Sequence, residues 1–68
     1  MEVKTSTQGV VYATQRVQNQ IQFDSNFGTN SGIFPTWIFV NARPSNPLIN
    51  LMQQNNIPWH ELHVPYAN

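Results

Sequence analysis

The chain has 68 residues, with three basic and three acidic side chains and no net charge at pH 7. It contains no cysteine, which excludes disulfide bonds, thiolate metal sites and thiol–disulfide oxidoreductase activity. Only 9% of its residues are charged, against about 25% in typical domains, so it lacks the basic surface that drives nucleic-acid binding and we expect no nucleic-acid partner.

The N-terminal third of the sequence indicates β-structure. Residues 1–8 are polar and fit either a frayed end or an edge strand. In residues 9–23 the odd positions carry Val11, Ala13, Val17, Ile21 and Phe23, and the even positions are polar from Thr14 onward. Such alternation is typical of a half-buried strand, here one long strand or two short ones. A helix remains the alternative, because Val10, Val17 and Ile21 share one helical stripe.

Residues 24–36 are rich in the residue types that form turns. Asp24, Asn26, Gly28, Asn30 and Gly32 all suit left-handed conformations or side-chain-stabilised turns. We therefore predict a long loop over 24–36. Phe27 is the candidate for a side chain held inward, and Pro35 marks the end of the loop.

The next stretch predicts a buried strand followed by a short helix. Residues 37–41 are almost continuously apolar, as in a strand covered on both faces. Ser45 or Asn46 then suits a helix N-cap, with Pro47 in the first turn. The apolar side chains that follow repeat at helical spacing and predict a helix over about 46–55; they are Leu48, Leu51 and Met52.

Residues 57–64 return to a strand pattern and complete a strand–helix–strand unit over 37–64. Two strands joined by a helix are parallel, with a right-handed crossover. We therefore predict an α/β (or α+β) fold. It consists of one small domain over residues 1–68, with a βαβ core at 37–64 and an added N-terminal long strand or hairpin.

Size and composition favour a protein that works by association. A chain of this length buries too little surface to be very stable alone, and Asn and Gln supply 16 of its residues in place of charges. A polar strand at 14–22, guarded only by Arg16, could pair with another copy. Aromatic and basic side chains are the candidate interface residues, namely Tyr12, Arg16, Trp37, Trp59 and Tyr66.

Two weaker chemical signals remain in the C-terminal half. On a strand, His60 and His63 face opposite sides, so they are only weak metal candidates, and we expect no metal and no cofactor. A small metal-dependent hydrolase that uses these two histidines with Glu61 stays as an alternative. The predicted helix N-terminus at Ser45 and Asn46, beside Arg43, is a candidate site for a small anion.

Residues 37–64 also resemble the first half of a glutaredoxin, a thioredoxin-like fold. The resemblance lies in the turn Arg43-Pro44-Ser45-Asn46-Pro47-Leu48-Ile49 and in the segment Asn56-Ile57-Pro58-Trp59. It implies a basic residue at Arg43 that contacts a ligand carboxylate. Both motif cysteines are absent, since Asn46 and Ile49 stand in their places. The resemblance thus implies a binding module for a small anionic ligand or peptide, without redox chemistry.

Taken together, these features predict a small non-catalytic structural or interaction protein. We expect it to form homo-oligomers or to serve as an accessory subunit of a larger assembly, such as a phage or virus particle. The N-terminus lacks the apolar core of a signal peptide, and no apolar run reaches the roughly 20 residues of a membrane span. We therefore expect the protein in the cytoplasm or in a virion, and not at a membrane.

Overall fold

The computed structural model describes residues 1–65 and shows a mixed fold of helices and short parallel strands. The fold class agrees with the expectation from sequence. In chain order the elements are β1 (Glu2–Lys4), β2 (Val10–Val11), α1 (Gln15–Ser31), β3 (Trp37–Val40), β4 (Arg43–Pro44), α2 (Asn46–Gln54) and β5 (Trp59–Leu62).

The main sheet has three parallel strands in the order β1-β3-β5. One row across the sheet joins Val3, Ile38 and His60. The strand–helix–strand unit predicted over 37–64 is confirmed, and the polar N-terminus forms the edge strand β1. The second sheet is a two-residue parallel pair of β2 and β4, which ties together the segments that lead into the two helices.

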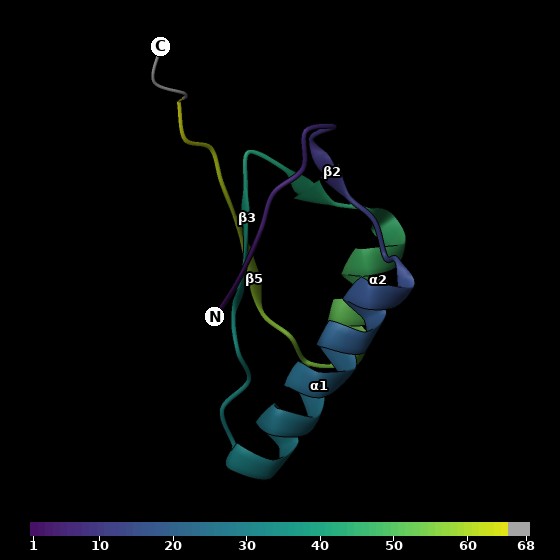
Figure 1. Cartoon of the computed structure of the whole chain (residues 1–68). Helices are drawn as coiled ribbons and strands as arrows, with labels where there is room; N and C mark the ends of the chain where they lie inside the picture. The colour runs from purple at the N-terminus through teal and green to yellow at the C-terminus, as the bar shows by residue number, and fades with distance from the viewer. Residues whose placement is uncertain (66–68) are drawn as a thin grey trace.

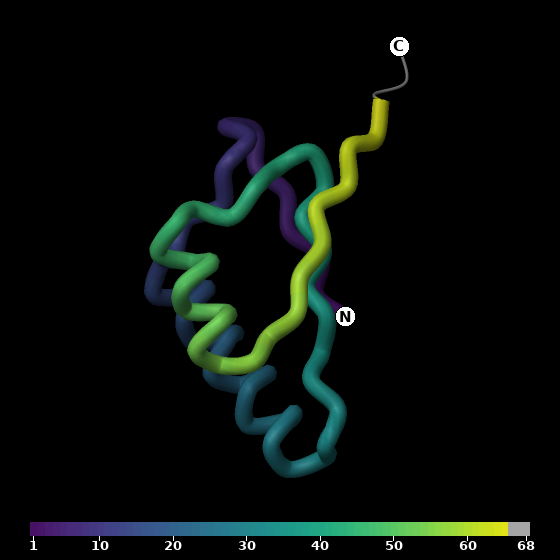
Figure 2. The backbone as a smooth tube through the Cα atoms, turned by 180° about the vertical axis from the view of Figure 1, so that it is seen from behind, coloured from purple at the N-terminus to yellow at the C-terminus, as the bar shows by residue number. Residues whose placement is uncertain are grey.

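Both helices cover the same face of the main sheet. Figures 1 and 2, seen from opposite sides, show α1 and α2 side by side, with the three strands together on one side of them. Two successive right-handed crossovers that move across a sheet in one direction place both helices on one face. Within residues 1–65 the other face of the sheet is therefore left without a helical layer.

The strand predicted over 9–23 is wrong from Gln15 onward, where the alternative of a helix is confirmed, and the loop predicted over 24–36 is wrong because α1 continues to Ser31. Thr14 caps the helix by accepting a hydrogen bond from the Val17 amide at 3.3 Å. Gly32 ends it in a left-handed conformation, and its amide donates to the Gly28 carbonyl at 2.8 Å. These two caps outweigh the alternating pattern, since they satisfy main-chain groups that would otherwise lose their partners.

The glutamines and asparagines of α1 support the helix on its exposed side. Gln15 donates to the Asn19 side chain at 3.0 Å, and Gln22 donates to the Asn26 side chain at 3.2 Å. Amide pairs four residues apart are neighbours on a helix surface and stabilise it modestly. The polar positions that mimic the outer face of a strand are thus the solvent side of a helix.

The core lies between the helices and the central strand β3. Its buried side chains are Val11, Val17, Ile21, Trp37, Phe39, Ala42, Leu48, Met52 and Ile57. Phe27, predicted to point inward, is 52% exposed; Phe34 instead packs against the core, with its ring on Gly28 of α1. A glycine in the helix leaves the space that this ring occupies.

The helix predicted over 46–55 is confirmed as α2, with bounds Asn46–Gln54. Ser45 is its N-cap and accepts a hydrogen bond from the Leu48 amide, and Pro47 lies in its first turn. Beyond the sheet, Asn41 holds the end of the C-terminal strand. Its side chain donates to the Val64 carbonyl and accepts from the Val64 amide, both at 2.8 Å, as a neighbouring strand would.

Candidate functional site

The most distinctive surface is the face of the main sheet that the helices leave uncovered. The strand register places five side chains on this open face, namely Val3, Ile38, Val40, His60 and Leu62. Four of the five are aliphatic. Val3 is 54% exposed and Leu62 is 48% exposed, which is unusual for aliphatic residues at paired positions in a parallel sheet.

No charged side chain lies at the paired positions of the open face. The three charged residues in the main sheet, Glu2, Lys4 and Glu61, occupy the rows of Trp37 and Phe39, on the helix-covered side. The other three belong to other elements: Arg16 and Asp24 to α1, and Arg43 to β4. All six charges of the chain are therefore segregated away from these apolar positions.

Sheets in which every strand is parallel are almost always covered on both faces. The exposed aliphatic face is therefore a candidate interaction surface. Three strands about 4.8 Å apart, each at most four residues long at about 3.3 Å per residue, give a flat area of at most about 190 Å². Stable interfaces bury about 800 Å² per partner, so the open face of one copy supports a small contact.

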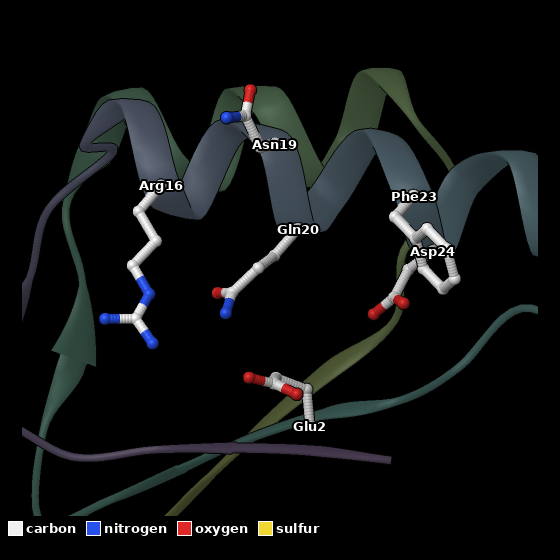
Figure 3. A pocket seen from close by; sticks show the side chains of 6 residues that line it. All are labelled: Glu2, Arg16, Asn19, Gln20, Phe23 and Asp24. Carbon is white, nitrogen blue, oxygen red and sulfur yellow. The ribbon is translucent and has the colours of Figure 1, made fainter.

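A second feature, the β1 groove, runs between the edge strand β1 and α1. It has a volume of about 670 Å³, and its walls come from both elements (Figure 3). The lining residues are Glu2, Arg16, Asn19, Gln20, Phe23 and Asp24. In Figure 3 the side chains of Arg16, Gln20 and Asp24 point down from the helix toward β1, whereas Asn19 points away.

Lys4 crosses the gap between β1 and α1 and is the main polar link between them. Its ammonium lies 3.2 Å from a carboxylate oxygen of Glu2, donates to the Gln20 side chain, and sits 5.5 Å from the centre of the Trp37 ring. The Trp37 indole in turn donates to Asp24 at 2.8 Å. These contacts hold the Lys4 ammonium beneath α1. Its charge therefore does not protect the free edge of β1 from pairing with another strand.

A smaller hollow of about 360 Å³ lies beyond the carboxyl ends of β3 and β5, the edge where ligands bind in many open α/β sheets. It is lined by Gly9, Asn41, Ala42, Arg43, Glu61 and His63. Arg43 and His63 could face an anion there, but the Glu61 carboxylate opposes one. The structure thus brings Arg43 together with Glu61 and His63, which the sequence placed in separate hypotheses.

The other predicted ligand residues, Ser45 and Asn46, do not line this hollow. The side-chain oxygen of Ser45 caps α2, and Asn46 is exposed in the first turn of that helix. The structure brings only Arg43 of the predicted anion site to the hollow. The reason is local: a serine that accepts the hydrogen bond of a helix amide is occupied by that contact.

The predicted interface residues differ in how exposed the structure leaves them. Trp37 is fully buried in the core, so its assignment to an interface is wrong. It lies on the covered side of the central strand, where a partner cannot reach it. Tyr12 is 55% exposed, Trp59 is half-buried against the core, and Arg16 is exposed at the β1 groove. Tyr66 lies outside the described residues.

His60 and His63 are separated as strand alternation predicts. His60 belongs to the open face, whereas His63 lines the hollow beyond the strand ends. Within residues 1–65 no three side chains of the His, Asp and Glu types gather into a metal-binding group. In the same part of the chain, neither helix is long and apolar enough to cross a membrane.

The sequence reasoning missed the open face because its members come from three strands far apart in the chain. Only the order β1-β3-β5 brings Val3 beside Ile38 and His60. Neither a protein-family model, nor a curated protein, nor a solved structure matches this chain.

Proposed function

We propose that this is a non-catalytic interaction protein that binds an amphipathic α-helix of a partner protein on the open face of its sheet. The observation that carries the proposal is a mostly aliphatic face, without Asp, Glu, Lys or Arg, on a sheet whose strands are all parallel. Covering that face removes aliphatic side chains from water, which is the main favourable term in protein association.

The dimensions of the open face suit a helix. Three strands span about 14 Å, and a helix with its side chains is about 10–12 Å across. Four residues of strand, the length of β3 and β5, cover about 13 Å, which equals about two and a half helical turns. A helix with aliphatic side chains on one stripe would give this sheet the second helical layer that parallel sheets normally have.

His60 provides the test position, because it is exposed on the open face and lies outside the core. A photo-crosslinking residue placed there is expected to trap one helical segment of a partner. Titration of that partner should then show at least about tenfold weaker binding to His60→Lys, since burying a lysine opposite aliphatic side chains leaves its charge without a partner.

Gln22 is the matched control, because it is exposed on α1, away from the open face. The same crosslinker at Gln22 should not trap the segment, and Gln22→Lys should bind the partner as the unmodified chain does. Equal crosslinking from both positions, or full binding by His60→Lys, contradicts the proposal.

A further inference from the structure

We infer that a second copy of this chain pairs with the free edge of β1, antiparallel to it, so that two three-stranded sheets join into one of six strands. The two-fold axis passes between the two copies of Val3, perpendicular to the sheet. This contact uses the main chain of β1 and the side chains of the β1 groove rather than the side chains of the open face.

The main-chain hydrogen-bonding groups of Val3 point to the free edge of β1, as this pairing requires. The Glu2 amide donates to the Thr36 carbonyl at 3.0 Å, so the main-chain groups of Glu2 point toward β3. Direction alternates along a strand, so the N–H and C=O of Val3 point to the free edge. Two antiparallel copies centred on Val3 would exchange both hydrogen bonds between these residues.

The side chains of β1 complement each other in that register. With Val3 opposite Val3 of the second copy, Glu2 lies opposite Lys4 of the second copy, and Lys4 lies opposite its Glu2. Both pairs stand on the helix-covered side, where Glu2 and Lys4 already form an ion pair within one chain. Opposite charges on facing strands stabilise an antiparallel pair, whereas like charges oppose it.

Helix α1, above the groove, also carries one basic and one acidic residue at equal distances from a central position. Arg16 and Asp24 lie four residues before and four residues after Gln20, and all three line the groove with Glu2. Gln20 accepts a hydrogen bond from Lys4, so along the strand direction it lies level with β1. An antiparallel copy therefore brings Arg16 of each chain to the Asp24 end of the other chain's groove, where one oxygen of the Asp24 carboxylate accepts from the Trp37 indole and the other is left for Arg16.

The opposite edge of the sheet lacks these properties. On β5 the Asn41 amide donates to the Leu62 carbonyl, so the main-chain groups of Glu61 point outward. Antiparallel pairing centred on Glu61 would set two carboxylates directly opposite each other. Pro58 and Pro65 flank this edge and limit its extension. The charge pattern therefore selects β1 as the edge that receives the second copy.

Joining two copies doubles the open face to a flat area of at most about 380 Å². Both open faces remain on the same side, because rotation about an axis perpendicular to the sheet keeps its faces in place. The dimer would thus present a platform for two partner helices, but its formation does not depend on any partner. Self-association of the purified chain tests it independently of the proposed function.

The test is the mass of the purified chain, measured by sedimentation over a range of concentrations. A dimer is expected for the unmodified chain and a monomer for Val3→Pro. Proline removes an outward N–H that β3 does not use, so the fold of one copy is kept. Arg16→Asp should weaken the dimer roughly tenfold, because two symmetry-related contacts change from attraction to repulsion.

Gln22→Asp is the control, because it places the same charge on an exposed position of α1 outside the groove. It should leave the dimer unchanged. The indole N–H signal of Trp37 reports whether each variant is folded, and if Val3→Pro is not, the comparison of Arg16→Asp with Gln22→Asp decides. A chain that stays monomeric at millimolar concentration, or a dimer equally affected by both aspartates, overturns the inference.

Discussion

Replacing Gly28 with alanine is expected to destabilise the protein by about 2 kcal/mol, although alanine is the better helix former by about 1 kcal/mol. A Cβ atom at this position would lie 2.2 to 2.5 Å from three atoms of the Phe34 ring. One of them is the ring atom nearest the main chain, so the whole ring must leave its place against α1. Urea unfolding measures the loss.

The double variant isolates the cause of that loss. In a Phe34→Ala background the ring is gone, and Gly28→Ala should then raise the free energy of unfolding by about 1 kcal/mol. Thr29→Ala, at an exposed position one residue further along α1, should cost little in either background. A loss from Gly28→Ala that persists without the Phe34 ring would contradict this explanation.

Replacing Trp37 with alanine is expected to cost about 3–5 kcal/mol, which is comparable to the whole stability of a domain this small. The side chain is fully buried, packs beside Phe39 and donates its indole N–H to Asp24 at 2.8 Å. Its removal leaves a large cavity and a carboxylate that has lost its hydrogen bond. Circular dichroism and urea unfolding should show a largely unfolded chain at room temperature.

Two further variants separate packing from the hydrogen bond. Trp37→Phe keeps most of the apolar volume but loses the donor to Asp24, so a smaller loss of about 1–3 kcal/mol is expected. Phe23→Ala should change stability by less than about 0.5 kcal/mol, because Phe23 is 73% exposed. Equal losses for Phe23→Ala and Trp37→Ala would show that the core is not where the structure places it.

The sequence predicts the C-terminal half of the fold well, because its local signals agree with one another. Ser45 and Pro47 mark the start of α2, and the apolar spacing after them is helical. Residues 37–41 form an apolar run of strand length, and β3 occupies most of it. Each element there is specified by its own residues, so little depends on the rest of the chain.

The N-terminal half is misread because the buried stripe of α1 is unusually thin. Its buried residues are Val17, Ile21 and Gly28, and a glycine gives no apolar signal. Phe23 and Phe27 point to solvent, so these two apolar residues do not mark the buried side of the helix. Phe23 instead extends the alternation that is typical of a strand. Thr14 and Gly32, which cap the helix 18 positions apart, are the signal that could have identified it.

The candidate site is harder to predict than the fold, because it depends on topology. Neither the open face nor the β1 groove is continuous in sequence, and both depend on β1 pairing with β3. The predicted polar strand at 14–22 does not exist as a strand, yet Arg16 does lie at the proposed copy-to-copy contact. Association through this side chain remains a prediction, with a different structural basis.

The most direct test of the central claim is how strongly a soluble paramagnetic agent broadens the methyl NMR signals of the protein, free and bound to its partner. In the free protein the open-face methyl groups of Val3, Ile38, Val40 and Leu62 should be broadened far more than those of Ile21, Leu48 and Ile57 in the core. Binding of the partner should remove that difference. Open-face methyl groups as protected as the core in the free protein, or still fully broadened in the complex, would contradict the account.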